Sequence, residues 1–224
     1  MARLSDYTDV LDEGTIRSWS AVARAVPEGS VLMGGTGLAI WLRHRRSADL
    51  DIFSPVRLDP ARIVASLSES GDFVHVEASE RIVRGTFNAV NVDIVAEDGV
   101  FALAHARELD GLLVASLQDI AAGKFGALVG RKQIRDFIDI MCIETLGNIR
   151  LEQGVMLYFR RYGINLHAAA VRATLQHLVD FRHLDDDPAM VEAFGKEIRY
   201  RVESYFRSRH PDVAAAFQHL LVDE

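Results

Sequence analysis

The stretch Leu32-Met-Gly-Gly-Thr-Gly-Leu-Ala-Ile-Trp-Leu-Arg-His-Arg-Arg-Ser-Ala-Asp-Leu-Asp-Ile-Phe-Ser54 decides the fold of this chain. The apolar residues 31–33 predict a short buried strand that ends in two glycines. Residues 36–46 predict a helix, and residues 49–54 predict a second strand. The sequence therefore predicts a strand, a glycine turn, a helix and a strand in direct succession.

The glycine turn has the features of a small anion site. Gly34 and Gly35 let the backbone approach a ligand closely, and the first amides of the helix near Thr36 favour a negative charge. A phosphate group fits such a turn in size and charge. Alternatively, Gly-Gly-Thr is only a turn, which is the commoner meaning of this pattern in isolation.

Two aspartates follow the predicted helix. Asp49 and Asp51 are spaced by two, so on a strand both carboxylates project from one face while Leu50 and Ile52 face the core. Adjacent carboxylates repel each other unless a cation lies between them, and Mg²⁺ takes carboxylate and phosphate oxygens together. The alternative is a solvated strand edge.

A third aspartate has a similar setting. Asp93 lies on the polar face of a predicted apolar strand, with Val92 and Ile94 opposite. Three carboxylates on neighbouring strands beside a phosphate loop form the two-metal arrangement for in-line displacement at phosphorus. Asp93 facing water is the alternative, but the joint occurrence of these motifs in this order favours the metal site.

The rest of the chain divides into two parts. Up to Ser116 helices and strands alternate, and from there on helical periodicity dominates. We therefore predict an α+β fold with a sheet-bearing domain at 1–115 and a helical domain at 116–224. Besides the elements above, the pattern predicts helices at 14–26 and 59–70, strands at 72–78, 81–87 and 89–96, and helices at 116–130, 133–146, 151–162, 165–180 and 188–209.

Composition excludes several classes of protein. The chain has 224 residues, 49% of them hydrophobic, and a net charge of −7, which argues against coating of nucleic acid by bulk electrostatics. The single cysteine, Cys142, excludes an internal disulfide framework and fits a core position. No apolar run is long enough to span a bilayer and the amino terminus is too polar for a secretory signal, so we expect a cytoplasmic protein without a membrane partner.

The motifs resemble those of a known superfamily. Gly34-Gly35-Thr36, Asp49-Leu50-Asp51 and the later Asp93 are similar to the signature of DNA polymerase beta-type nucleotidyltransferases. Residues 32–54 as a whole resemble one branch, the AbiEii abortive-infection toxins, which also have a lysine helix, here with Lys124, and a following Arg-Asp motif, here Arg135-Asp136. The resemblance covers about residues 30–140 and implies a nucleotidyltransferase-fold mixed sheet flanked by helices, followed by a C-terminal helical lobe.

The resemblance also implies a reaction. It would be the Mg²⁺-dependent transfer of a nucleoside monophosphate from an NTP to an acceptor hydroxyl, by the toxin of a toxin–antitoxin or phage-defence pair. The acceptor it suggests is the 3′ end of tRNA, which makes the tRNA acceptor stem and a cognate antitoxin expected partners. Two other functions stay open: transfer to a small molecule or a protein, and nucleotide binding without turnover.

Residue roles follow from the same resemblance. Gly34, Gly35 and Thr36 would hold the triphosphate. Asp49 and Asp51 would bind Mg²⁺, with Asp93 as a third ligand. Lys124 would neutralise triphosphate charge, and Asp136 would orient the nucleotide or act as a polar catalytic residue.

The spacing of the helical residues supports this assignment. Lys124, Leu128 and Arg131 are at i, i+4 and i+7, so Lys124 and Arg131 can form a cationic stripe suited to phosphate oxygens. The alternative is a solvated helix face. Asp136 lies in a strongly apolar helix, where a carboxylate usually has a specific partner, and Lys124 is one candidate. Arg135 and Asp139 are at i, i+4 and are interpreted as a surface salt bridge.

The last helices carry many arginines and tyrosines. These residues could form a track that binds a polynucleotide, with tyrosines that stack on bases. Because acidic residues outnumber basic ones over 151–224, a mixed solvated helix surface is the favoured interpretation. The residues concerned are Arg160, Arg161, Arg199, Arg201, Arg207, Arg209 and His210, with Tyr158, Tyr162, Tyr200 and Tyr205.

Overall fold

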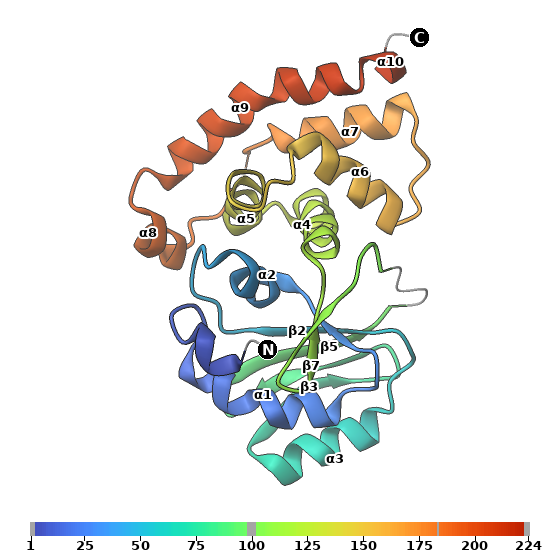
Figure 1. Cartoon of the computed structure of the whole chain (residues 1–224), viewed down its shortest axis with the longest axis vertical. Helices are drawn as coiled ribbons and strands as arrows, with labels where there is room; N and C mark the ends of the chain where they lie inside the picture. Colours follow the sequence, from blue (N-terminus) through green and yellow to red (C-terminus); the bar gives the residue numbers. More distant parts are fainter. Residues whose placement is uncertain (1–2, 98–101, 183, 222–224) are drawn as a thin grey trace. The chain divides into compact units, whose positions relative to one another are not determined.

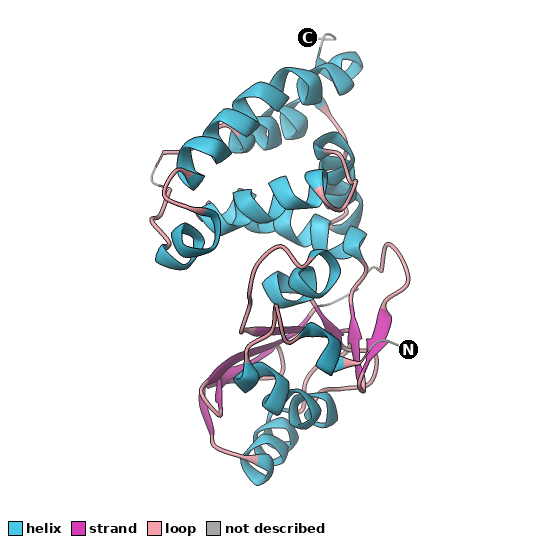
Figure 2. Ribbon diagram, turned by 60° about the vertical axis from the view of Figure 1, so that its left-hand side comes forward, coloured by secondary structure: helices cyan, strands magenta, loops and turns pink. Residues whose placement is uncertain are grey.

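The computed structural model describes residues 3–97, 102–182 and 184–221. They form a mixed sheet with helices and a helical C-terminal part, which confirms the predicted α+β class. The chain divides into two compact units, residues 1–120 and 121–224. Figure 2 shows strands in one part of the molecule and only helices and loops in the other. The division into two separate domains with a boundary at residue 115 remains a prediction.

The described residues of the first unit form a seven-stranded sheet in the order β3-β4-β5-β2-β1-β7-β6. The pairs β2–β5 and β1–β7 are parallel, and the other neighbours are antiparallel. The strands are β1 Val31–Leu32, β2 Leu50–Ser54, β3 Phe73–Ala78, β4 Ile82–Phe87, β5 Val90–Ala96, β6 Arg107–Leu109 and β7 Leu112–Val114.

The β6–β7 hairpin is absent from the elements predicted from the sequence. Each of its strands has three residues, which is too short for a period of two to be visible. The turn between them consists of Asp110 and Gly111, both with positive φ. An Asp-Gly pair is a strong hairpin signal, so this turn could have been predicted.

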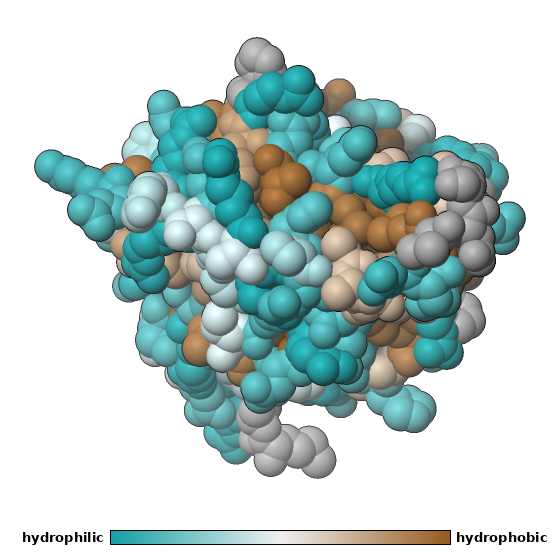
Figure 3. Space-filling model, turned by 90° about the horizontal axis from the view of Figure 1, so that it is seen from above, coloured by the Kyte–Doolittle hydropathy of each residue, from teal (hydrophilic) through white to brown (hydrophobic). Residues whose placement is uncertain are grey.

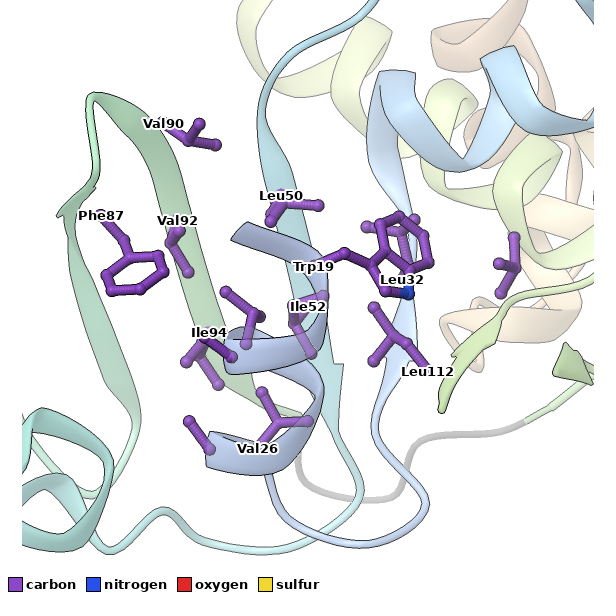
Figure 4. Close-up of a cluster of buried hydrophobic side chains, with 14 of the residues drawn as sticks. Trp19, Val26, Leu32, Leu50, Ile52, Phe87, Val90, Val92, Ile94 and Leu112 are labelled. Carbon is purple, nitrogen blue, oxygen red and sulfur yellow. The ribbon is translucent and has the colours of Figure 1, made fainter. Parts of the chain in front are cut away.

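The helices α1 and α3 cover the apolar face of the sheet. Trp19 of α1 packs in one buried cluster with Leu50 and Ile52 of β2 and Val92 and Ile94 of β5 (Figure 4). Because side chains alternate along a strand, the residues between these core positions project from the opposite face. The helical elements are η1 Leu4–Tyr7, α1 Glu13–Ala25, α2 Gly34–Leu42 and α3 Pro60–Ser70.

The helix after the glycine turn differs from its prediction at both ends. α2 already begins at Gly34, and it ends at Leu42 rather than at residue 46. Arg43 has φ 50 and leaves the helix in a left-handed conformation. The arginines that follow therefore lie in a loop, where Arg43 pairs with Asp9 and Arg46 with Asp12.

The second unit consists of helices (Figure 1). The predicted single helix at 188–209 is wrong, because Gly195 adopts φ 92 and divides it into α8 and α9. α9 continues past Pro211. The helices are α4 Leu117–Arg131, which begins in the first unit, α5 Ile134–Thr145, α6 Leu151–Arg161, α7 Ala168–Leu178, α8 Pro188–Phe194, α9 Ile198–Ala216 and α10 Gln218–Leu221.

Candidate active site

Gly34 brings the start of α2 against the sheet. It has φ 63, which favours glycine, and a Cβ atom there would overlap Asp51 Oδ2 and lie 2.8 Å from Asp51 Cγ. The Asp51 carboxylate therefore lies directly against the Gly34 backbone. The N-cap residue, Met33, makes no side-chain cap hydrogen bond, although the first amides of any helix have no intrahelical acceptor.

Thr36 ties α2 to the segment that carries the first aspartate. Its side chain is buried, and its hydroxyl lies within hydrogen-bond distance of the Asp49 carbonyl oxygen and, at 3.0 Å, of Ser47 Oγ. In this arrangement Thr36 fixes the position of Asp49. Its predicted contact with a triphosphate is not tested by these bonds and stays a prediction.

The second glycine of the turn lies beneath an arginine. A Cβ atom on Gly35 would lie 2.7 Å from Arg45 Nη2 and 3.1 Å from Ser47 Oγ. Gly35 thus leaves room for a guanidinium close to the start of α2. This arginine reaches the turn from the loop after the helix, so helical spacing could not reveal the proximity.

Three carboxylates lie on the sheet face opposite the core. The register pairs Asp51 of β2 with Asp93 of β5, and Asn91 Nδ2 donates to Asp49 Oδ1 over 2.9 Å. Leu50 and Ile52 are fully buried on the other face, as the alternation predicts. We call Asp49, Asp51 and Asp93 the carboxylate face.

Arg84 contacts the third member of this face. It belongs to β4 and pairs in register with Asp93, and its Nε donates to both carboxylate oxygens over 2.8 and 2.9 Å. Arg84 is not among the site residues predicted from the sequence. The turn at Asn88 and Ala89, both with positive φ, is a two-residue hairpin that sets residue 84 opposite residue 93, so a hairpin assignment would have found it.

Asp49 and Asp51 suit a divalent cation. Carboxylate oxygens on one face, beside a glycine with no side chain to obstruct them, are the donors that Mg²⁺ takes together with substrate phosphates. Within the described ranges, no group of three or more His, Cys, Asp or Glu side chains is arranged to hold a metal ion. The residues therefore fit an ion that two carboxylates hold and phosphate oxygens complete.

The second unit contains a charge cluster in which a lysine and two aspartates are buried and an arginine is half exposed: Lys124, Asp136, Asp139 and Arg131. We call it the buried charge cluster after its three buried members. Lys124 Nζ lies 2.7 Å from Asp139 Oδ2 and 3.7 Å from Asp136 Oδ1. Arg131 donates to both oxygens of Asp136 over 2.9 and 2.8 Å. Both aspartate side chains have no exposed surface, and that of Lys124 is 6% exposed. The cluster thus contains two cations and two anions.

The structure contradicts one alternative and one interpretation from the sequence. Lys124 is not on a solvated face, and Asp139 does not form a surface salt bridge with Arg135. Arg135 Nε donates instead to Gln133 Oε1 over 2.9 Å. The helix α5 is buried on nearly every side, so its aspartates need partners from another helix. Lys124 is a partner of Asp136, as proposed from the sequence, but its closer contact is with Asp139.

The arginines of α9 are largely engaged within their own unit. Arg199 and Arg207 lie 3.4 Å from Glu203, and Arg209 lies 2.9 Å from Glu144, to which Tyr205 also donates. One face of the molecule mixes hydrophilic residues with a strip of hydrophobic ones (Figure 3). These contacts favour the mixed helix surface over a polynucleotide track.

Comparison with known proteins identifies the family. No curated protein matches the chain. The described residues include no helix that is both long and apolar enough to cross a membrane. The family model described as the nucleotidyl transferase AbiEii toxin of type IV toxin–antitoxin systems matches residues 20–221, which include every candidate residue above. The chain therefore belongs to the AbiEii family of nucleotidyl transferase toxins.

Proposed function

We propose that this nucleotidyltransferase uses Mg²⁺ to transfer a nucleoside monophosphate from an NTP to the 3′ end of tRNA. The observation that carries the metal and phosphate part of the proposal is the position of Asp49 and Asp51 on one sheet face, with Asp51 against Gly34 at the start of α2. Two carboxylates and a set of helix amides are complementary to a cation and to the phosphates that accompany it.

The reaction forms one bond and breaks another at the α-phosphorus. The acceptor hydroxyl oxygen bonds to phosphorus and loses its proton, and the bond to the bridging oxygen of the β-phosphate breaks to release pyrophosphate. Mg²⁺, when bound, supplies positive charge to the phosphate oxygens and lowers the pKa of the attacking hydroxyl. Asp49 and Asp51 hold that cation, and the amides of Gly34 and Gly35 bind phosphate oxygens.

The resemblance to the family implies roles for three residues of the second unit, which we keep in the proposal. Lys124 neutralises triphosphate charge, Arg131 binds phosphate, and Asp136 orients the nucleotide. The structure adds Asp139, which holds the Lys124 ammonium at 2.7 Å. A lysine with a fixed ammonium acts as a positioned point charge rather than as a flexible surface cation.

The partners follow from the family and the proposed acceptor. A toxin of a type IV system implies a cognate antitoxin, and the nucleotidyl transferase class implies an NTP substrate. The tRNA acceptor stem is our proposal for the second substrate, and a small molecule or a protein is the alternative acceptor. Nucleotide binding without turnover is the third possibility.

One transfer experiment separates these functions. We would incubate the full chain with α-³²P-labelled NTPs, Mg²⁺ and total tRNA, and in parallel with added protein or an aminoglycoside. The proposal expects label in tRNA with the wild type and none with Asp51→Asn. Asp9→Asn, which changes an exposed aspartate paired with Arg43, is the matched control and should transfer normally. Label found only on the protein or on the aminoglycoside would show that tRNA is not the acceptor. Binding of the NTP without any transfer would contradict the proposed reaction.

A further inference from the structure

A row of four charged side chains crosses the sheet at the carboxylate face. The registers pair Glu77 of β3 with Arg84 of β4, Arg84 with Asp93 of β5, and Asp93 with Asp51 of β2. Residues paired in register project from the same face of a sheet. Arg84 therefore lies between a carboxylate of the candidate metal site and a carboxylate of the edge strand.

The contact between Arg84 and Asp93 engages both oxygens of the carboxylate. Besides the two bonds from Nε, Arg84 Nη2 lies 2.8 Å from Asp93 Oδ2. The Asp93 side chain is 29% exposed and that of Arg84 is 49% exposed. A divalent cation that uses Asp93 as a ligand competes with this guanidinium for the same two oxygens. Because the pair is partly solvated, it is weak enough to be displaced.

The charge of this face explains why a guanidinium belongs there. Asp49, Asp51 and Asp93 bring three carboxylates to one face, and Arg84 places a positive charge directly beside Asp93. The pKa of Arg84 is raised by Asp93 first, and further by Glu77 and Asp51, so the guanidinium stays charged. Glu77, on the other side of Arg84, offers it a second partner when it leaves Asp93.

We propose that Arg84 is a built-in competitor of the divalent cation: it holds Asp93 away from the metal until the cation displaces it. Asp49 and Asp51 then bind the metal before Asp93 does, and Arg84 sets the affinity of the face for a free ion. This inference rests on the metal site of the proposed function. Arg84 is a positioning residue, since it acts through Asp93.

The test measures binding of Mn²⁺, as a spectroscopic substitute for Mg²⁺, to the full chain without nucleotide. Electron paramagnetic resonance reports the free Mn²⁺ directly, so the readout does not depend on enzyme activity. Arg84→Gln should raise Mn²⁺ affinity about fivefold, the order expected when one partly exposed ion pair no longer competes. Asp93→Asn in the wild-type background should change affinity less than twofold.

The double variant and Asp93→Asn alone together identify the cause of any gain. If Arg84→Gln acts by releasing Asp93, then Arg84→Gln with Asp93→Asn returns to wild-type affinity. Because the two substitutions cancel in net charge, a gain from net charge alone would also be reversed in the double variant, and Asp93→Asn alone separates the two causes. Net charge alone predicts that Asp93→Asn lowers Mn²⁺ affinity about as much as Arg84→Gln raises it, about fivefold. That result would overturn the inference, as would a gain that persists in the double variant or an unchanged affinity of Arg84→Gln. Arg57→Gln, a similarly exposed arginine that pairs with Glu80 over 3.9 Å beyond the other end of β2, is the matched control.

A further variant separates this inference from the proposed function. Asp51→Asn should abolish Mn²⁺ binding in both the wild-type and the Arg84→Gln background. If it does so while Arg84→Gln has no effect, the metal site stands and only the role of Arg84 fails. If Asp51→Asn leaves Mn²⁺ binding intact, the metal site of the proposed function itself fails, and the inference about Arg84 fails with it.

Discussion

The carboxylate face of the sheet and the buried charge cluster of the second unit contain similar residue types under opposite conditions. On the sheet, the three carboxylates are partly exposed, and Asp93 pairs with Arg84, which is also partly exposed. In the cluster, Lys124 and Arg131 balance Asp136 and Asp139, and both carboxylates are fully buried. The carboxylates of the first arrangement are open to solvent and to a cation, whereas those of the second are closed to solvent and paired with two cations.

This difference has an energetic basis. A buried charge has lost its hydration, so removing its partner leaves a large uncompensated cost. Partly exposed carboxylates retain water, which lets them exchange it for a metal ion. Substitutions in the cluster should therefore change stability most, and substitutions on the sheet face should change ligand binding most.

The largest expected effect comes from Asp139→Asn, which breaks the balanced cluster. It leaves the Lys124 ammonium with only the more distant Asp136, so the free energy of unfolding should fall by about 3–5 kcal/mol. Urea unfolding measures this loss. Replacing the pair together, as Lys124→Met with Asp139→Leu, should recover most of it, and a single-variant loss below about 1 kcal/mol would contradict a buried, essential partner.

The second prediction concerns Gly34→Ala, which changes the carboxylate face of the sheet. The methyl group would overlap the Asp51 carboxylate, and the positive φ adds strain, so stability should fall by about 2 kcal/mol. The distinguishing result is loss of Mn²⁺ binding in a chain that still folds. Gly163→Ala is the control, because Gly163 also has positive φ but has no atom within 4 Å of the added Cβ. It should lose stability and keep Mn²⁺ affinity.

The stability that Glu144 contributes should depend on pH. Burial alone would raise its pKa, but hydrogen bonds from Arg209, Tyr205 and the Leu151 amide outweigh burial and lower it. The carboxylate therefore contributes stability that is fully present above its unfolded pKa of 4.5 and is lost as pH falls through the lower folded value. Glu144→Gln should cost about 1.5 kcal/mol at pH 7.

The measurement is urea unfolding of both chains at several pH values. The difference between wild type and Glu144→Gln should be constant from neutral pH down to about the unfolded pKa and shrink in more acidic solution. A difference that grows on acidification would mean that the folded pKa is raised, and the hydrogen bonds to Arg209 and Tyr205 would not account for the stability.

The smallest effect is expected for an exposed pair. Arg17 and Glu13 of α1 lie 3.2 Å apart at i, i+4, with side chains 71% and 87% exposed. Glu13→Gln should change the free energy of unfolding by no more than about 0.5 kcal/mol. A loss comparable to that of Asp139→Asn would show that burial does not separate the two classes of ion pair.

Local sequence pattern was sufficient to predict the carboxylate face. A period of two places Asp49 and Asp51 opposite Leu50 and Ile52, and this follows from strand geometry alone. The pairing of Asp93 with Arg84 depends on the register of the β4–β5 hairpin, which the spacing of single motifs does not specify. The carboxylate face was therefore predictable from the sequence, whereas the position of Arg84 beside it was not recognised.

The buried cluster shows the opposite limit. Helical spacing correctly places Asp136 and Asp139 on α5, but it does not say which side of a helix is buried. Since α5 is apolar on nearly every side, that composition already indicates a helix buried all round, where Asp139 cannot form a surface pair. Its contact with Lys124 joins two helices and requires the tertiary structure.

The most direct test of the proposed reaction compares two positions of the label in the NTP. With tRNA and Mg²⁺, the wild-type protein should transfer label from α-³²P NTP and none from γ-³²P NTP. The reason is that the γ-phosphate leaves as part of the pyrophosphate. Asp51→Asn should transfer neither, while Glu13→Gln should behave as the wild type. Transfer of the γ label, or α-label transfer that survives Asp51→Asn, would contradict nucleotidyl transfer at the carboxylate face.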